Sequence, residues 1–162
     1  MGTSSALFQI VILLHIAAAI VGFGGMIAHS TYHARAFRAP AGIARTLLEA
    51  TSGVARWADY GIYAVLPLGI VAIAVSDETF SMGDPWVSAS FLVWFLLLGA
   101  IHGAVRPAIK TMTGRAEAVE PGTVLETDDE ASTAAQKLMI GEGASQLLLV
   151  IALVLMVWKP GS

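Results

Sequence analysis

The chain contains no cysteine among its 162 residues, and only 13% of its residues are charged. The absence of cysteine excludes disulfide bonds, thiolate zinc sites, iron–sulfur clusters and cysteine nucleophiles. The charged fraction is about half of that found in soluble domains. The net charge is only -3, and no basic cluster is interleaved with aromatic residues. Both observations argue against a nucleic-acid partner.

Apolar residues make up 56% of the chain, more than a water-soluble core of this size could bury. Four apolar stretches approach the roughly 20 residues that a membrane-spanning helix needs. We place these stretches at about 6–28, 57–75, 85–105 and 135–158. The sequence predicts one all-α domain over residues 1–162, a polytopic four-transmembrane-helix bundle with the lipid bilayer around it and little mass outside. The first stretch lacks a basic leader and a cleavage site, so we expect it to be retained.

The basic residues are distributed unevenly along the chain. Eight of them lie in or beside the first and third connections between the spans: Arg35, Arg38, Arg45, Arg56, Arg106, Lys110, Arg115 and Lys137. By the positive-inside rule these connections are cytoplasmic, so both termini are expected outside. We expect a multi-pass protein of the plasma (inner) membrane of a prokaryote. The acidic, Pro- and Gly-containing connection at about 111–134 is expected to be a mobile, solvated cytoplasmic loop.

A stripe of histidines and small residues follows one face of the first span. It consists of His15, Ala18, Gly22, Gly25, His29 and His33, at offsets that place them on one side of a helix. Histidine is costly within hydrocarbon, so His15 is expected to face the bundle interior. The small residues would let a neighbouring helix or a flat ligand approach closely.

Three interpretations of this stripe remain open. It could be a helix–helix seam with hydrogen-bonded histidines. It could bind one haem b through His15, with a methionine, a lysine or nothing opposite and with Gly22, Gly25 and His29 contributing to the cofactor site. His15 and His29 are roughly 21 Å apart along a helix, which resembles membrane b-type cytochromes, but four histidines are too few for a complete two-haem site. Alternatively, His29 and His33, at i and i+4, could bind a transition metal.

A second pattern is a layer of ionisable residues at similar depth, one from each span. The layer consists of His29, Asp59, His102 and Glu142, with Arg106 and Gln146 one turn away from it. Intramembrane carboxylates usually mark a partner, a cation or a proton path. The layer therefore predicts a structural pair of Glu142 with Arg106 or His102, a metal site of His29, His33, His102 and Glu142, or a proton relay. His15 lies roughly 12 Å from the depth of His102, so the two are not expected to share one iron.

Several sequence segments resemble a known group of membrane proteins. They are "LLHIAAAIVGFGGMIAHS", the "GDPW" before the third span and the "RP" at its end. Over nearly the whole chain they resemble the domain-of-unknown-function family 2269, predicted four-helix integral membrane proteins. More distantly, His15 followed by small residues is similar to copper-resistance D membrane proteins and HemJ-type protoporphyrinogen oxidases. That similarity implies His15 as a haem or metal ligand.

Four functions remain open at this point. The first is a small non-enzymatic accessory that binds haem b or a transition metal in redox or metal handling. The second is a proton-coupled small transporter that uses Glu142, His102 and Asp59. The third is a structural subunit, either of a homo-oligomer or of a larger membrane complex. The fourth, implied by the distant similarity, is oxidation of a porphyrinogen. The sequence singles out no catalytic residue for it.

Overall fold

Three long helices and one interrupted helix make up the fold. The computed structural model describes residues 3, 5–77 and 79–161. The uninterrupted helices are α1 (Ala6–Phe37), α2 (Ala41–Ala74) and α5 (Asp129–Trp158). The third rod consists of α3 (Pro85–Ala100), a π-helical turn η1 (Ile101–Val105) and α4 (Arg106–Ala118). All four rods are long and apolar enough to cross a membrane. The predicted all-α, four-helix membrane protein is confirmed.

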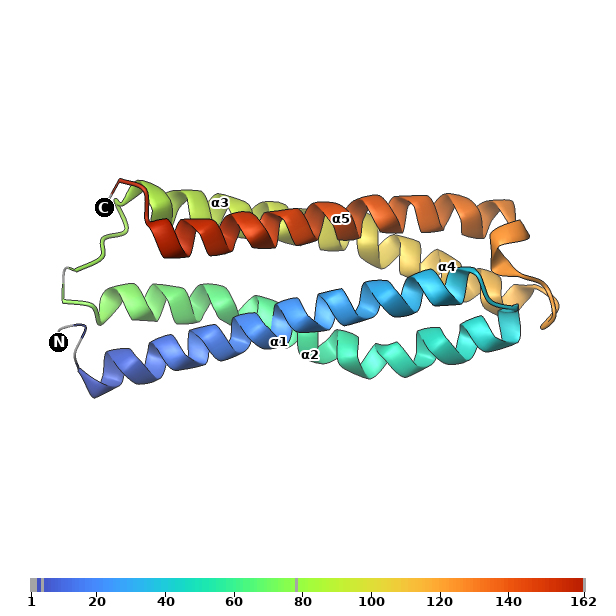
Figure 1. Cartoon of the computed structure of the whole chain (residues 1–162), viewed down its shortest axis with the longest axis horizontal. Coiled ribbons are helices and arrows are strands. Elements are labelled where there is room, and N and C mark those ends of the chain that lie inside the picture. The colour runs from blue at the N-terminus through green and yellow to red at the C-terminus, as the bar shows by residue number, and fades with distance from the viewer. Residues whose placement is uncertain (1–2, 4, 78, 162) are drawn as a thin grey trace.

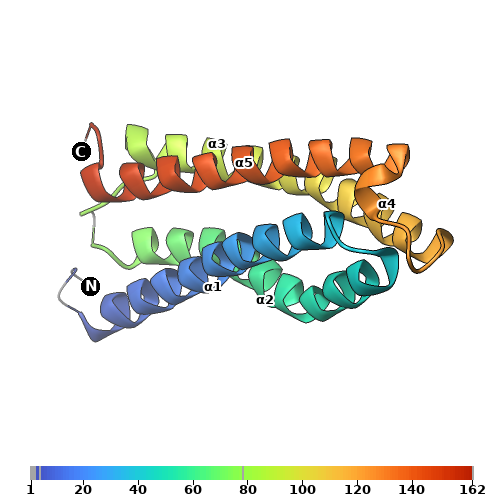
Figure 2. The same cartoon turned by 45° about the vertical axis from the view of Figure 1, so that its right-hand side comes forward.

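The rods form two hairpins that pack as two layers. One layer contains α1 and α2, and the other contains α3, α4 and α5 (Figure 1). A second view separates the same two layers (Figure 2). The start of α1 and the end of α5 lie at one end of the bundle, which we call the terminal end (Figure 1). The α1–α2 and α4–α5 connections lie at the opposite end, here called the basic end because the arginines and lysines gather near these connections.

Capping residues explain where several helices begin. The Ser5 side chain accepts a hydrogen bond from the Phe8 backbone N–H at the start of α1. Asp128 does the same for Ala131 at the start of α5, at 2.8 Å. Side-chain oxygens at this position satisfy N–H groups that a helix leaves unpaired. Pro85 occupies the first turn of α3. The Asp84 side chain caps no N–H of α3 and accepts a hydrogen bond from the backbone N–H of Ser81.

The third rod changes its winding at Pro107. Proline has no N–H to donate, and its ring collides with the carbonyl four residues earlier. That carbonyl belongs to Gly103, within the π turn Ile101–Val105. The wider turn lets the rod continue as α4 to Ala118 instead of ending at the proline. The expected end of the span at about residue 105 is therefore an internal change of winding.

The helices extend well beyond the expected spans at the basic end. α2 has 34 residues and is roughly 51 Å long, compared with a hydrocarbon core of about 30 Å. It begins at Ala41 instead of 57, and α1 continues to Phe37 instead of 28. The helices are therefore longer than the expected spans at this end. Hydropathy missed the extension because its buried face consists largely of alanine.

The expected loop over 111–134 was also wrong in extent. Its first third is helical in α4 and its last part in α5, which leaves a connection of residues 119–128. This connection folds back onto the α1–α2 turn. Ala41 N–H donates to the Thr123 carbonyl at 2.8 Å, and Gly42 N–H donates to the Pro121 carbonyl at 3.0 Å. Backbone hydrogen bonds of this kind hold the segment in place.

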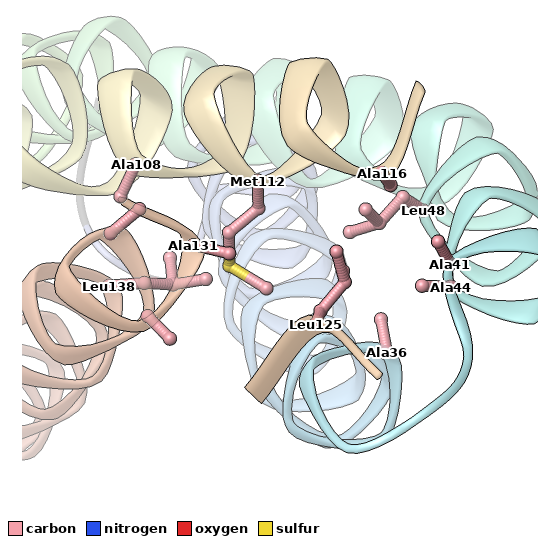
Figure 3. Close-up of a cluster of buried hydrophobic side chains, with 12 residues drawn as sticks. Ala36, Ala41, Ala44, Leu48, Ala108, Met112, Ala116, Leu125, Ala131 and Leu138 are labelled. Carbon is pink, nitrogen blue, oxygen red and sulfur yellow. The ribbon is translucent and has the colours of Figure 1, made fainter. Parts of the chain in front are cut away.

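A hydrophobic cluster fills the basic end beneath this connection. Leu125 and Met112 are both fully buried there. Met112 from α4 and Leu125 from the connection point into the cluster, and alanines of α1, α2, α4 and α5 surround them (Figure 3). Small side chains let four helices approach closely with little void space. The cluster therefore anchors the two hairpins to each other at this end.

The small residues of the predicted stripe form the seam between α1 and α2. A Cβ atom added to Gly22 would lie 2.9 Å from the Ile62 backbone nitrogen, and one added to Gly25 would lie 2.5 Å from the Ala58 Cβ. These two glycines therefore allow the helix backbones to touch. The interpretation of the stripe as a helix–helix seam holds for its central residues.

Candidate functional site

A large cavity lies between the two hairpins toward the terminal end. Its volume is about 690 Å³, and side chains from all four rods line it. The lining is almost wholly apolar and includes Phe23, Leu66, Phe91, Leu149 and Met156. Small-molecule sites in proteins have about 300–1,000 Å³ and a similar apolar lining. We call this space the terminal cavity.

His15 stands at the wall of the terminal cavity, opposite α2. Gly69 makes room for the ring, since a Cβ on Gly69 would lie 3.2 Å from the His15 Cε1. The backbone of Val65 offers the ring a hydrogen-bond acceptor. The Nδ1 atom is buried and has no hydrogen-bond partner among the described residues. His15 therefore faces the bundle interior, as the sequence predicted, with one nitrogen uncompensated.

Other groups with polar or polarisable atoms share the terminal cavity. The indole nitrogen of Trp86 is buried, and the described part of the chain offers it no hydrogen-bond partner. The Lys159 ammonium lies 4.0 Å from the centre of the Phe80 ring and 5.8 Å from that of Trp86. Met156 contributes a thioether side chain to the lining. The cavity thus combines a broad apolar wall with a few groups that could bind a ligand's polar part.

The rest of the predicted cofactor set does not reach this cavity. Gly22 and Gly25 are covered by α2 in the seam, and His29 lines a different cavity nearer the basic end. Only His15 of the four predicted residues lines the terminal cavity. The two glycines do not line the cavity because α2 packs closely against the face of α1 on which they lie.

The predicted polar layer contains a buried pair that joins α1 to α5. His33 Nδ1 and Glu142 Oε1 are 2.7 Å apart. His33 is 4% exposed and Glu142 is 9% exposed. The expected pairing of Glu142 with Arg106 or His102 was wrong. Because α1 continues past residue 28, His33 is still inside the bundle and reaches the carboxylate first.

The remaining residues of the layer form a separate, exposed network between α2 and the third rod. Arg106 binds Asp59 at 2.6 Å and contacts the Tyr63 hydroxyl at 3.5 Å. The same hydroxyl is 2.6 Å from His102 Nε2. Sequence reasoning missed Tyr63, although it lies one helical turn after Asp59. Elsewhere, the predicted residue Gln146 donates to Ser30 Oγ at 3.3 Å.

His29 lies between these two groups. Its Nε2 atom is buried, and no described residue provides a hydrogen-bond partner. The ring centre is 5.7 Å from that of His33, and both rings line a cavity of about 460 Å³. We call this space the basic-end cavity.

The predicted metal set of four residues is divided by the structure. His29, His33 and Glu142 lie near one another, while His102 binds Tyr63 instead. Over the residues that the structure describes, no group of three or more His, Asp or Glu side chains is arranged to hold a metal ion. The third rod places His102 against Tyr63 of α2, away from the other three residues of the set.

The helices, their length and their apolar surface define a multi-pass integral membrane protein with two cavities between its rods. A comparison with protein families places the chain more narrowly. It belongs to the family of predicted integral membrane proteins DUF2269, whose model matches residues 9–160. The resemblance seen in the sequence is thereby confirmed. No curated protein and no solved structure matches the chain.

Proposed function

We propose that the protein binds one haem b in the terminal cavity, with His15 as an axial ligand, and acts as an accessory in redox or metal handling. The observation that carries this proposal is the buried, unpartnered Nδ1 of His15, counted over the described residues, at the wall of a cavity of about 690 Å³. An imidazole nitrogen without a partner is costly in an apolar environment. Coordination to iron would offset that cost.

The other residues of the cavity fit the same ligand. Met156 shares the lining with His15, and His/Met pairs are known axial ligands of haem iron. Lys159 supplies a cation, which suits the propionate groups of a haem. The aromatic rings of Phe80 and Trp86 beside it suit a flat ring system. When bound, the haem would supply one-electron redox chemistry.

Absorption spectroscopy tests the proposal directly. The full chain is expressed with added haem precursor, purified in detergent and measured reduced minus oxidised. We expect a Soret band and b-type α and β bands, which disappear in His15→Ala. The matched control is His102→Ala, because His102 lies outside the terminal cavity. The absence of a Soret band in the parent, or an unchanged band in His15→Ala, would overturn the proposal.

We further propose that the basic end faces the cytoplasm of a prokaryotic cell and the terminal end faces out. The support is the clustering of Arg35, Arg38, Arg45, Arg115 and Lys137 near the two connections of the basic end. Basic residues close to membrane spans are retained on the cytoplasmic side. The terminal cavity would then lie in the outer half of the membrane.

A further inference from the structure

His29 and His33 are placed as two ligands of one metal ion would be. They occupy positions i and i+4 of α1, and their ring centres are 5.7 Å apart. Two imidazoles bound tetrahedrally, each at about 2.0–2.1 Å from a metal, have ring centres roughly 5 Å apart. The observed separation is close to that value. Both residues are at least nine-tenths buried, so their ring positions are restricted by packing.

The contact between His33 and Glu142 supports this arrangement. When the His33 Nδ1–H donates to the carboxylate, at 2.7 Å, the Nε2 atom keeps its lone pair for a metal. Metal-binding histidines in proteins commonly donate their other N–H to a carboxylate in this way. Glu142 then orients His33 and is not itself a ligand. His29 contributes a buried Nε2 atom that has no partner within the described ranges.

The charges around the two rings also favour a cation. His29 interacts electrostatically with the carboxylates of Glu142 and Asp59. Glu49 and Asp59 line the same basic-end cavity, together with the cationic side chains Arg106 and Lys110. Arg106 is held by Asp59 at 2.6 Å. The charge of Arg106 is thus partly neutralised, while Glu142 lies directly against His33.

We infer that His29 and His33 bind one divalent transition-metal ion, such as Zn²⁺ or Co²⁺, at the basic-end cavity, with Glu142 as a positioning residue. With two protein ligands, water would fill the remaining positions, so the site is more open than a zinc site with three protein ligands and one water. The site is independent of the haem proposal, because it uses neither His15 nor the terminal cavity. It differs from the metal set expected from the sequence in two respects: His102 takes no part, and Glu142 orients a ligand.

Cobalt provides the test, since bound Co²⁺ has visible absorption bands. The full chain is purified in detergent with any histidine tag removed, Co²⁺ alone is titrated, and Zn²⁺ is then added to displace it. We expect saturable binding that is lost in His29→Ala and in His33→Ala. His15→Ala and His102→Ala serve as matched controls and retain the parent affinity.

Glu142→Gln tests whether Glu142 orients His33 or binds the metal ion itself. Glutamine keeps an oxygen that accepts from His33 Nδ1, so the cobalt bands should keep their shape while affinity falls by about 10–100-fold. A change of band shape to a different coordination geometry would show that Glu142 is a ligand and would overturn its assigned role.

His29→Ala also serves as a folding control. His29 Nε2 makes no hydrogen bond to any described residue, so the variant should keep the parent's elution volume and lose only the packing of a buried ring. Parent-like cobalt binding by His29→Ala, or no cobalt spectrum from the parent at millimolar Co²⁺, would overturn the site. The haem spectrum is measured separately and does not enter this result.

Discussion

Gly61 of α2 lies so close to Gly22 of α1 that a methyl group on Gly61 would stand 2.5 Å from the Gly22 backbone nitrogen. The same methyl group would be 2.6 Å from the carbonyl oxygen of Ala18. Both neighbours are backbone atoms, which cannot rotate away as a side chain could. The two helices can keep their present crossing only if residue 61 has no side chain.

We therefore predict that Gly61→Ala destabilises the protein by about 1–3 kcal/mol, the usual cost of overpacking. The measurement is the unfolding midpoint of the detergent-purified chain. Gly143→Ala is the control, because no described atom beyond its own helix backbone lies within 4 Å of the added Cβ. That variant should be neutral or slightly more stable, since alanine favours helix over glycine by about 0.5–1 kcal/mol. Equal midpoints for the two variants would contradict the described seam.

Leu125 is predicted to hold the α4–α5 connection against the bundle. It is 0% exposed, so Leu125→Ala should cost about 2–5 kcal/mol by leaving a cavity. The freed connection, residues 119–128, should be cut faster by a protease in a limited digestion. Glu126→Ala changes the exposed neighbour and should behave as the parent. If cleavage rates were the same for both variants, the packing of this connection would be in doubt.

The contact of Asp128 with Arg115 predicts a pH dependence of stability. Hydrogen bonds from the Arg115 guanidinium, and then from the Ala131 backbone N–H, hold the pKa of Asp128 below its ordinary value of 3.8. A carboxylate with a lowered folded-state pKa stabilises the fold above its unfolded pKa. That contribution is lost as the pH falls through the folded value.

Asp128→Asn tests this contribution. Asparagine is about as good a helix N-cap as aspartate, so the variant should keep the start of α5 but lose the charge pair with Arg115. At neutral pH its melting midpoint should be lower than that of the parent. The two midpoints should converge as the pH falls through the folded-state pKa of Asp128, which lies below its ordinary value of 3.8. A constant difference between the two curves across the acid range would rule out the pair as its source.

The absence of cysteine makes the orientation easy to measure. Thr79→Cys places a single thiol in the α2–α3 connection at the terminal end, and Glu120→Cys places one at the basic end. Both positions are exposed. In intact cells an impermeant maleimide should label Thr79→Cys and leave Glu120→Cys unlabelled until the membrane is permeabilised. The reverse pattern would invert the proposed topology.

The sequence predicted the number and type of helices because apolar stretches of spanning length leave little alternative. The expected starts of the first and third spans, at 6 and 85, coincide with the starts of α1 and α3. The basic ends were missed. There the helices continue on a buried face of residues such as Ala36 and Ala116, whose short side chains give a weak hydropathy signal.

The candidate sites were predicted only in part, for a related reason. The orientation of His15 followed from the cost of imidazole in lipid. The predicted metal set named His33 and Glu142 together, but their direct contact was not predicted, because Glu142 was expected to pair with Arg106 or His102. The grouping of Asp59, His102 and Arg106 by depth was sound. Depth alone, however, does not show which face of a helix a residue occupies. Tyr63, which contacts His102 and Arg106, was missed because it is uncharged and the layer was built from ionisable residues.

The π turn has a consequence for insertions and deletions in this rod. Val93, Leu97 and Ile101 recur every four residues on the buried side of the rod, and Ala108, Met112 and Ala116 do the same after the turn. In a helix with 3.6 residues per turn, a four-residue spacing drifts steadily around the axis. The wider turn at 101–105 takes up this drift. Deleting one residue there would close the wider turn to an ordinary α turn and keep Met112 on the buried side, but it would remove the wider turn that accommodates Pro107. Deleting one residue after the turn, where the winding is regular, would instead rotate everything that follows by roughly 100°.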